Sequence, residues 1–184
     1  IIDPVRKLPA AFFGGHMILK GDGFEIRPLT ACKLDAAVQV YRQSNEGTRR
    51  DPQQRISGQN VLEDMTLSRQ DGGIFCGIYD QEDELAGVLD FVPANFAGRS
   101  DNACIRSLKI AAPYRNRGLG GRAIDRLEEE LRKDIHLKYL WACFPENCST
   151  WQEFAARHGF RQAGKVERSQ IESFVEVTWV KNLT

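Results

Sequence analysis

Apolar residues along this chain recur either at every second position or at every third to fourth position, which predicts strands alternating with helices. The helical spacing predicts four helices, which follow Thr30, surround residues 61–65, run from Pro113 to about residue 133, and occupy residues 150–158. Alternating or continuous apolar runs predict strands at residues 24–29, 74–79, 85–92, 104–110, 139–144, 166–168 and 174–180. This order predicts an α/β domain with a mixed, mostly antiparallel sheet flanked by helices.

The strand at residues 104–110 has an interrupted alternation. Ile105 and Leu108 are three positions apart, and Leu108 and Ile110 are two apart, whereas side chains on one face of a regular strand are always two apart. The inward phase therefore slips, which predicts a β-bulge near Arg106 and Ser107.

Residues 115–121 read Arg-Asn-Arg-Gly-Leu-Gly-Gly and connect this strand to a predicted amphipathic helix. The first turn of a helix presents unpaired N–H groups and the positive end of the helix dipole, and glycines let a phosphate approach these donors. Arg115, Arg117 and Arg122 add positive charge, and the first acidic residue of the helix is Asp125. The segment therefore predicts a site for an anion such as a pyrophosphate.

Two other phosphate-binding motifs fit this segment less well. A P-loop requires GxxxxGK[ST], which the chain lacks. The dinucleotide motif GxGxxG/A is satisfied by residues 118–123, but it needs an acidic residue at the end of the next strand, about 20 positions on. The strand at 139–144 contains no acid, and the next one is Glu146. A dinucleotide oxidoreductase is therefore a remote alternative.

The segment LKIAAPYRNRGLGGRAIDRLEEEL resembles the main coenzyme A motif of the GNAT family of N-acetyltransferases, whose core is [QR]xxGx[GA]. Arg115, Gly118 and Gly120 match every specified position. FEIRPLTACKLDAAVQVYRQ is similar to the opening strand and helix of that family, and ENCSTWQEFAARHGF to its segment from an asparagine to Gly-Phe. The likeness extends over residues 23–183 and implies a GNAT-like acyl-CoA acyltransferase fold, with its sheet split by a cofactor cleft.

The resemblance implies that acetyl-CoA is the cofactor and that its acetyl group passes to a primary amine of a small molecule or peptide. It places Asn147 near the pantetheine arm, although the spacing from Asn147 to Gly159 is slightly longer than the family's. The Ile110 N–H would point at the thioester carbonyl. The strand Leu108, Lys109 and Ile110 would pair with the pantetheine, and the motif Arg115, Asn116, Arg117, Gly118, Leu119, Gly120 and Gly121 would hold the pyrophosphate, through the N–H groups of residues 117–121.

The chain departs from the family at the positions that carry proton transfer. Alignment backwards from Gly159 places Ala155 where a tyrosine general acid is usual, and Arg106 or Ser107 stands where a glutamate is common. Asp90, on the neighbouring strand, is the one acid predicted to face inward, and its alternative is a surface carboxylate. Cys143 could protonate the leaving thiolate, or it could be a packed core thiol. The catalytic residues are therefore left unassigned, and a non-catalytic acyl-CoA-binding module is the main rival.

Arginines crowd the predicted loop between the first two helices, at Arg49, Arg50 and Arg55. In the family this loop usually covers the acceptor, so we expect Arg49 and Arg50, with Asp90, to contact the substrate and to select a carboxylate or phosphate on it. The alternative is a solvated run of charge.

Composition narrows the partners and the compartment. The 184 residues contain 25 Lys and Arg and 25 Asp and Glu, so no net charge draws the chain to nucleic acid or to an acidic membrane. No apolar run approaches the ~18 residues of a membrane span. The five cysteines form no CxxC and lie far from the three histidines, which disfavours a metal site and disulfides and indicates a reducing, cytoplasmic compartment.

The run Gly14, Gly15, His16, Met17 resembles a cloning junction. We therefore expect residues 1–16 to be vector-derived and residues 17–184 to form a single acetyltransferase domain; the alternative is a natural extension. If the extension is ordered, Phe12 and Phe13 are the side chains most able to hold it, against this chain or against a neighbour. The sequence leaves the oligomeric state open between a monomer and a homodimer.

Overall fold

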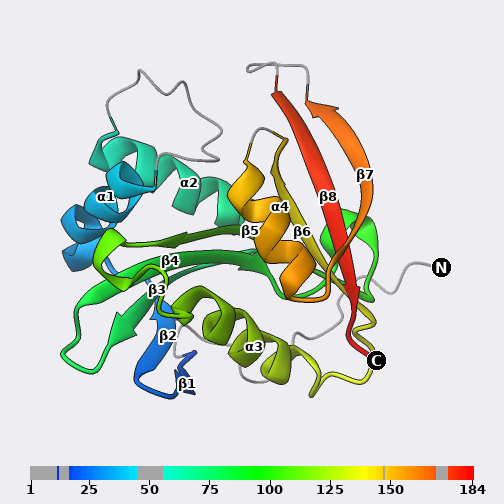
Figure 1. Ribbon diagram of the computed structural model, residues 1–184, viewed down its shortest axis with the longest axis horizontal. Coiled ribbons are helices and arrows are strands. Elements are labelled where there is room, and N and C mark those ends of the chain that lie inside the picture. The colour runs from blue at the N-terminus through cyan, green and yellow to red at the C-terminus, as the bar shows by residue number, and fades with distance from the viewer. Residues whose placement is uncertain (1–11, 13–16, 45–55, 147, 169–173) are drawn as a thin grey trace.

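The computed structural model describes residues 12, 17–44, 56–146, 148–168 and 174–184, and they form one mixed sheet with helices on both faces (Figure 1). The α-helices in the described part of the chain are α1 (Leu34–Gln43), α2 (Gly58–Gln70), α3 (Leu119–Leu131) and α4 (Ser149–Arg157). The strands are β1 (Leu19–Gly21), β2 (Phe24–Pro28), β3 (Ile74–Asp80), β4 (Leu85–Val92), β5 (Asn102–Ile110), β6 (Tyr139–Pro145), β7 (Arg161–Arg168) and β8 (Phe174–Asn182).

The eight strands lie in the order β1-β2-β3-β4-β5-β6-β8-β7. Every neighbouring pair is antiparallel except β5 and β6, which are parallel and are joined by the crossover through α3. The mixed, mostly antiparallel sheet predicted from the sequence is thereby confirmed.

Two strands differ from the sequence prediction for local reasons. β1 was not predicted, because its three residues are too few to show a period. β7 begins at Arg161, five residues before the predicted start, because residues 161–165 of this edge strand are exposed and carry no apolar alternation. Both are edge strands, where one side of the ladder has no neighbour and side-chain burial constrains the sequence least.

The helices divide between the two faces of the sheet, with α1 and α2 on one face and α3 and α4 on the other (Figure 1). The larger core lies on the α3 face, where the predicted stripe of Leu119, Ala123, Ile124, Leu127 and Leu131 is fully or almost fully buried. The smaller core packs α1 and α2 against β3 and β4.

Phe12 belongs to the larger core. Its side chain is 6% exposed, and its ring meets that of Phe91 on β4 edge to face, with the centroids 5.6 Å apart. The expectation that Phe12 would make contacts is therefore correct, and the contact is with this chain's own sheet. Phe13 lies outside the described residues.

Candidate active site

The sheet forks between β5 and β6. The two strands pair from Asn102 with Tyr139 to Ile105 with Ala142, and beyond these residues each continues without the other (Figure 1). On the other side of β5, Asp90 of β4 pairs with Ser107, whereas the next residue of β4, Phe91, pairs with Ile105. Arg106 is therefore an extra residue without a partner on β4, which confirms the predicted bulge and places it at the fork.

The backbone of β5 beyond the fork directs alternate residues toward the cleft. The Ala111 N–H donates to the Ala86 carbonyl on β4 at 2.9 Å, so in an antiparallel ladder Lys109 also faces β4, whereas Leu108 and Ile110 turn their N–H and C=O groups to the side that β6 has left. Of the three residues predicted to pair with the pantetheine, Leu108 thus offers its N–H and C=O groups to the cleft and Ile110 its N–H, since the Ile110 carbonyl accepts from Arg115 and Ser44. The Lys109 ammonium lies 5.1 Å from the ring centroid of Tyr41 on α1.

The N-terminus of α3 lies beside the end of β5. Asn116 and Gly118 have φ values of 57° and 74°, which turn the chain sharply before Leu119. The first helical bond runs from the Arg122 N–H to the Gly118 carbonyl at 3.0 Å, so the N–H groups of Leu119, Gly120 and Gly121 have no acceptor within the helix. No acidic residue lies in this first turn. The backbone here is therefore suited to a phosphate oxygen.

The glycines of this turn differ in what a side chain at each position would meet. A Cβ on Gly121 would lie 2.6 Å from Cε1 of His158, so a side chain there would displace the end of α4. A Cβ on Gly120 would lie 3.5 Å from the side chains of Leu108 and Ile110 and 3.7 Å from Phe154, which shows that Gly120 sits where β5, α3 and α4 meet. Gly118 needs glycine for its left-handed backbone, since a Cβ there would meet nothing.

The three arginines of the motif do not converge. The Arg115 guanidinium donates to the Ile110 carbonyl at 2.9 Å, to Ser44 Oγ at 3.0 Å and to the Gln43 carbonyl, and so ties β5 to the end of α1. Arg122 donates to the Asp22 carbonyl at 3.1 Å. Arg117 is exposed and borders a depression of about 410 Å³ that Asp80 and Tyr114 also line. Arg115 therefore shapes the cleft, and direct contact between Arg115 and a phosphate stays a prediction.

Asp90 lies beneath α2, on the face opposite α3, and is 4% exposed. Its Oδ1 accepts from Ser68 Oγ at 2.5 Å, and its Oδ2 lies 3.5 Å from Arg106 Nε. Contact between Asp90 and the acceptor stays a prediction. The other predicted acceptor contacts, Arg49 and Arg50, and the predicted pantetheine contact Asn147 lie outside the described residues.

Aromatic side chains of α4 line its side of the fork. Phe144 of β6 stacks on Trp151 at 3.8 Å between centroids, Trp151 meets Phe154 edge to face at 5.1 Å, and Phe154 lies 4.3 Å from the ring of His158. Ala155 is 1% exposed within the larger core. Phe154 and, at the end of α4, His158 thus border the glycine turn, and neither Phe154 nor Ala155 can donate a proton.

The sequence analysis missed three buried carboxylates, Glu128 and Glu130 of α3 and Glu176 of β8. Glu176 is 1% exposed and lies opposite Pro145, in the part of β6 beyond its pairing with β5. The β6–β8 register puts Glu176 on the same sheet face as Thr178 and Cys143, opposite the face that α4 covers. Within the alternating run of β8 a glutamate predicts a solvent-facing position, so only the tertiary arrangement could reveal its burial.

Comparison with known proteins identifies the class. The profile of the acetyltransferase (GNAT) family matches residues 34–160, and the chain belongs to this family. A GNAT acetyltransferase from Bacillus anthracis superposes with a TM-score of 0.69 at 15% identity, covering 91% of this chain and 99% of that one. No curated protein sequence matches the chain.

Two further structures share the fold. An acetyltransferase from Salmonella typhimurium that modifies the N-terminal serine of a 50S ribosomal subunit protein has a TM-score of 0.69 at 15% identity, over 90% of this chain and 98% of that one. A second Salmonella typhimurium acetyltransferase, solved with acetyl-CoA, has a TM-score of 0.62 at 14% identity, over 89% and 95%. The chain is thus an acetyltransferase that uses acetyl-CoA.

Proposed function

We propose that this acetyltransferase transfers the acetyl group of acetyl-CoA to a primary amine of a small molecule or peptide, with the cofactor lying in the fork between β5 and β6. The observation that supports this most strongly is that the cleft-facing part of β5 is continuous with the first turn of α3. The cleft-facing backbone of Leu108 and Ile110 leads directly to the N–H groups of Leu119, Gly120 and Gly121. An extended ligand that ends in phosphates fits this succession of donors and acceptors.

Acetyl-CoA supplies the acetyl group as a reactive thioester, and the protein supplies position. The N–H groups of Leu108 and Ile110 are preorganised donors on the cleft side, where the Ile110 N–H can stabilise negative charge on the thioester oxygen. The first turn of α3 holds the pyrophosphate through its backbone and dipole. Fixing both reactants in one cleft provides much of the rate enhancement, so a weak base need not abolish activity.

The acceptor would approach from the face that carries α1 and α2, because the predicted acceptor contact Asp90 lies on that face. On that side we propose contacts from Arg49, Arg50 and Asp90, with Asn147 beside the pantetheine. Glu176 adds a buried carboxylate on the same face, which could accept the proton that the attacking amine loses.

A non-catalytic acyl-CoA-binding module is the second candidate. It is supported by Ala155 and Phe154, which leave α4 without a proton donor for the departing thiolate at these positions. Release of free coenzyme A thiol from acetyl-CoA in the presence of a panel of amines separates the two. We expect thiol release that depends on one class of amine. Calorimetric binding of acetyl-CoA without amine-dependent release would favour the binding module, and no binding would reject both.

We also propose a compartment for the protein. The five cysteines form no CxxC and lie far from the histidines, a spacing that supports a reducing compartment such as the cytoplasm. No helix in the described part of the chain is long and apolar enough to cross a membrane. We further propose that residues 17–184 form the acetyltransferase domain, as a monomer or a homodimer.

A further inference from the structure

The fork of the sheet coincides with a network of charged and polar side chains that the cofactor contacts do not use; it is buried at Asp90 and exposed at Asp71. Arg106, the extra residue of the β5 bulge, has only 12% of its side chain exposed. Its guanidinium lies 3.5 Å from Asp90 on β4 and donates to Asp71 at 2.6 Å. Asp90 in turn accepts from Ser68 of α2. The network therefore joins β4, the bulge and the end of α2.

We propose that the Asp90–Arg106 pair positions the bulge, and thereby sets the opening between β5 and β6 that receives the pantetheine arm. The inference rests on the proposed cofactor site. A bulge residue lacks its ladder partner, so its backbone position depends on what its side chain is attached to. Here the side chain is attached to a carboxylate that is itself buried and held by α2, and β5 leaves β6 one residue after Ile105.

The geometry also accounts for the choice of arginine. A guanidinium has donors on several sides, and Arg106 uses Nε toward Asp90 and Nη1 toward Asp71 and the Leu67 carbonyl. A lysine carries a single ammonium and cannot span these acceptors in the same way. Toward the cofactor, Asp90 and Arg106 are positioning residues, because they act on it through the backbone of β5; this role of Asp90 is separate from its proposed contact with the acceptor.

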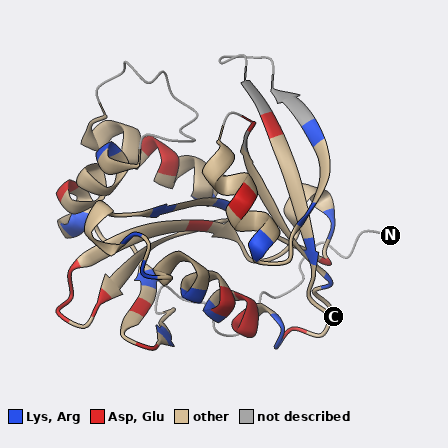
Figure 2. Ribbon diagram, in the orientation of Figure 1, with Lys and Arg blue, Asp and Glu red and all other residues tan. Residues whose placement is uncertain are grey.

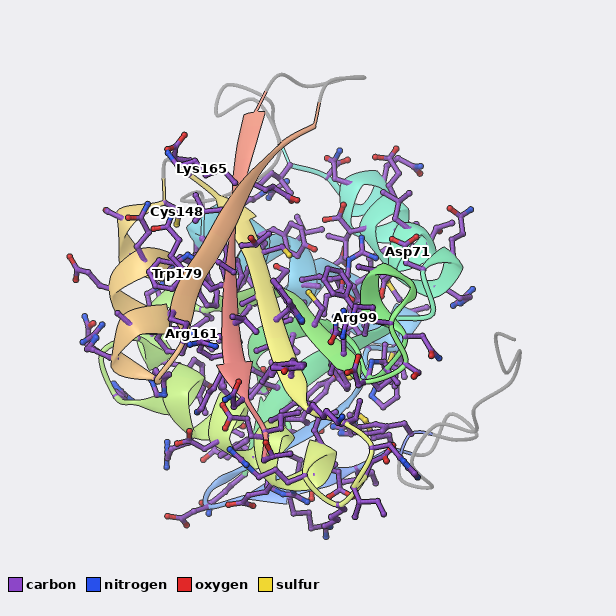
Figure 3. The ribbon with its side chains drawn as sticks, turned by 90° about the vertical axis from the view of Figure 1, so that its right-hand side faces the viewer. Asp71, Arg99, Cys148, Arg161, Lys165 and Trp179 are labelled. Carbon is purple, nitrogen blue, oxygen red and sulfur yellow. The ribbon has the colours of Figure 1, made fainter. Side chains whose placement is uncertain are left out.

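Asp71 caps the end of α2, so it connects this network to the face of the sheet on which we propose that the acceptor binds. Figure 3 shows Asp71 at the end of α2, and Arg99 in the loop before β5. Arg99 forms a comparable but exposed pair with Asp101 at 3.4 Å, at the start of β5 and away from the fork. This second Arg–Asp pair, in the loop that leads into β5, provides a matched control away from the fork.

The test compares the double variant Asp90→Asn/Arg106→Met with Arg99→Met/Asp101→Asn. Removing both charges avoids leaving one of them buried and unpaired, so the fork variant is expected to fold. Calorimetry measures the Kd of coenzyme A and of 3′-phospho-ADP, which lacks the pantetheine, and the comparison of the two isolates binding in the pantetheine cleft. We expect the Kd of coenzyme A to rise about tenfold in the fork variant, with the Kd of 3′-phospho-ADP unchanged and both Kd values unchanged in the control.

The outcomes separate this inference from the proposed cofactor site. If the wild-type protein binds neither ligand, the cofactor site itself is wrong. If the wild-type protein binds coenzyme A and the fork variant binds it equally well, or loses both ligands in parallel with its melting temperature, the pair has only a structural role and the inference is overturned. Should the double variant fail to fold, Arg106→Lys repeats the comparison, with partial retention of coenzyme A affinity expected.

Discussion

The two sides of the fork are built on different chemistry. On the cofactor side, the groups that face the cleft are backbone N–H and C=O groups of β5 and of the first turn of α3, and glycines expose them. The other groups around the fork are side chains: Arg106 from the bulge of β5, Phe154 from α4 and Glu176 from β8. Figure 2 shows basic residues near the start of α3 and acidic ones along its second half, so charge on this helix also favours an anion at its beginning.

This difference explains why one side keeps a sequence motif and the other does not. Backbone recognition needs particular φ values and missing side chains, which only a few residues supply, so the motif at residues 115–121 is readable in the sequence. Side-chain recognition can be met by many residues from several elements, so it varies with the acceptor. The cofactor of the enzyme is therefore clearer from its sequence than its substrate is.

The largest effect is expected from a charge placed in the glycine turn. Gly120→Glu puts a carboxylate where β5, α3 and α4 meet, and repulsion from the pyrophosphate should raise the Kd of acetyl-CoA by on the order of 100-fold. Gly120→Gln is the matched neutral control and should lose much less. Isothermal titration calorimetry measures both, and equal losses for the two variants would show that bulk, and not charge, governs this position.

Phe12, which is distant in sequence from the cofactor motif, packs against the sheet that carries the proposed cofactor site. Its buried ring packs on Phe91 of β4, so Phe12→Ala should lower the free energy of unfolding by about 3 kcal/mol, or the melting temperature by roughly 6–12 °C. Deletion of residues 1–16 should lower it at least as far.

Solution mass, measured on the same deletion variant, tests whether this segment also holds an oligomer together. An unchanged melting temperature for both the Phe12→Ala protein and the deletion variant would mean that the segment contributes nothing to the fold, as expected of a vector-derived extension.

The elements predicted well are those with a strong apolar period. The stripe of α3 and the runs of β4 and β5 were recognised because burial on a defined face repeats every few residues, and the bulge was visible because one repeat fails. The helix after Pro113 begins only at Leu119, because Asn116 and Gly118 take left-handed conformations that periodicity does not reveal.

The candidate site also contains features that could be predicted from the sequence and features that could not. The glycine turn could be predicted because its constraint is local. The pairing of Arg106 with Asp90, the engagement of Arg115 with α1 and the burial of Glu176 could not, because each depends on elements that are distant in sequence and are brought together only by the sheet order.

On α4, two neighbouring substitutions should behave differently. Ala155→Tyr forces a large side chain into a position that is 1% exposed, so overpacking should cost about 1–3 kcal/mol. Phe154→Tyr adds only a hydroxyl beside the glycine turn and should leave stability nearly unchanged. Thermal unfolding and amine-dependent thiol release measure the two variants together. A stable, more active Ala155→Tyr protein would show that the position faces the cleft as the family's tyrosine does.

The smallest effect concerns the hydrogen bond that anchors the residue before the motif. Tyr114 donates to Asp80 Oδ2 at 2.6 Å; this bond raises the pKa of Tyr114 to about 12 and lowers the pKa of Asp80, which also accepts from the backbone N–H groups of Glu82 and Glu84. Tyr114→Phe should therefore cost about 1 kcal/mol near neutral pH, or roughly 2–4 °C.

The sign of the pH dependence follows from the two shifts. Because the pKa of Asp80 is lower in the folded protein, its contribution is present above the ordinary aspartate pKa of about 3.9 and is lost as the pH falls through the folded value. Because the pKa of Tyr114 is raised, its contribution is present below about pH 10 and is lost as the pH rises toward 12. The melting-temperature gap between wild type and Tyr114→Phe should be widest between these limits and should narrow in acid. A gap that persists unchanged at pH 2–3 would mean that the phenol stabilises the turn by packing alone, so that the anchor of the cofactor side does not depend on the Asp80 carboxylate.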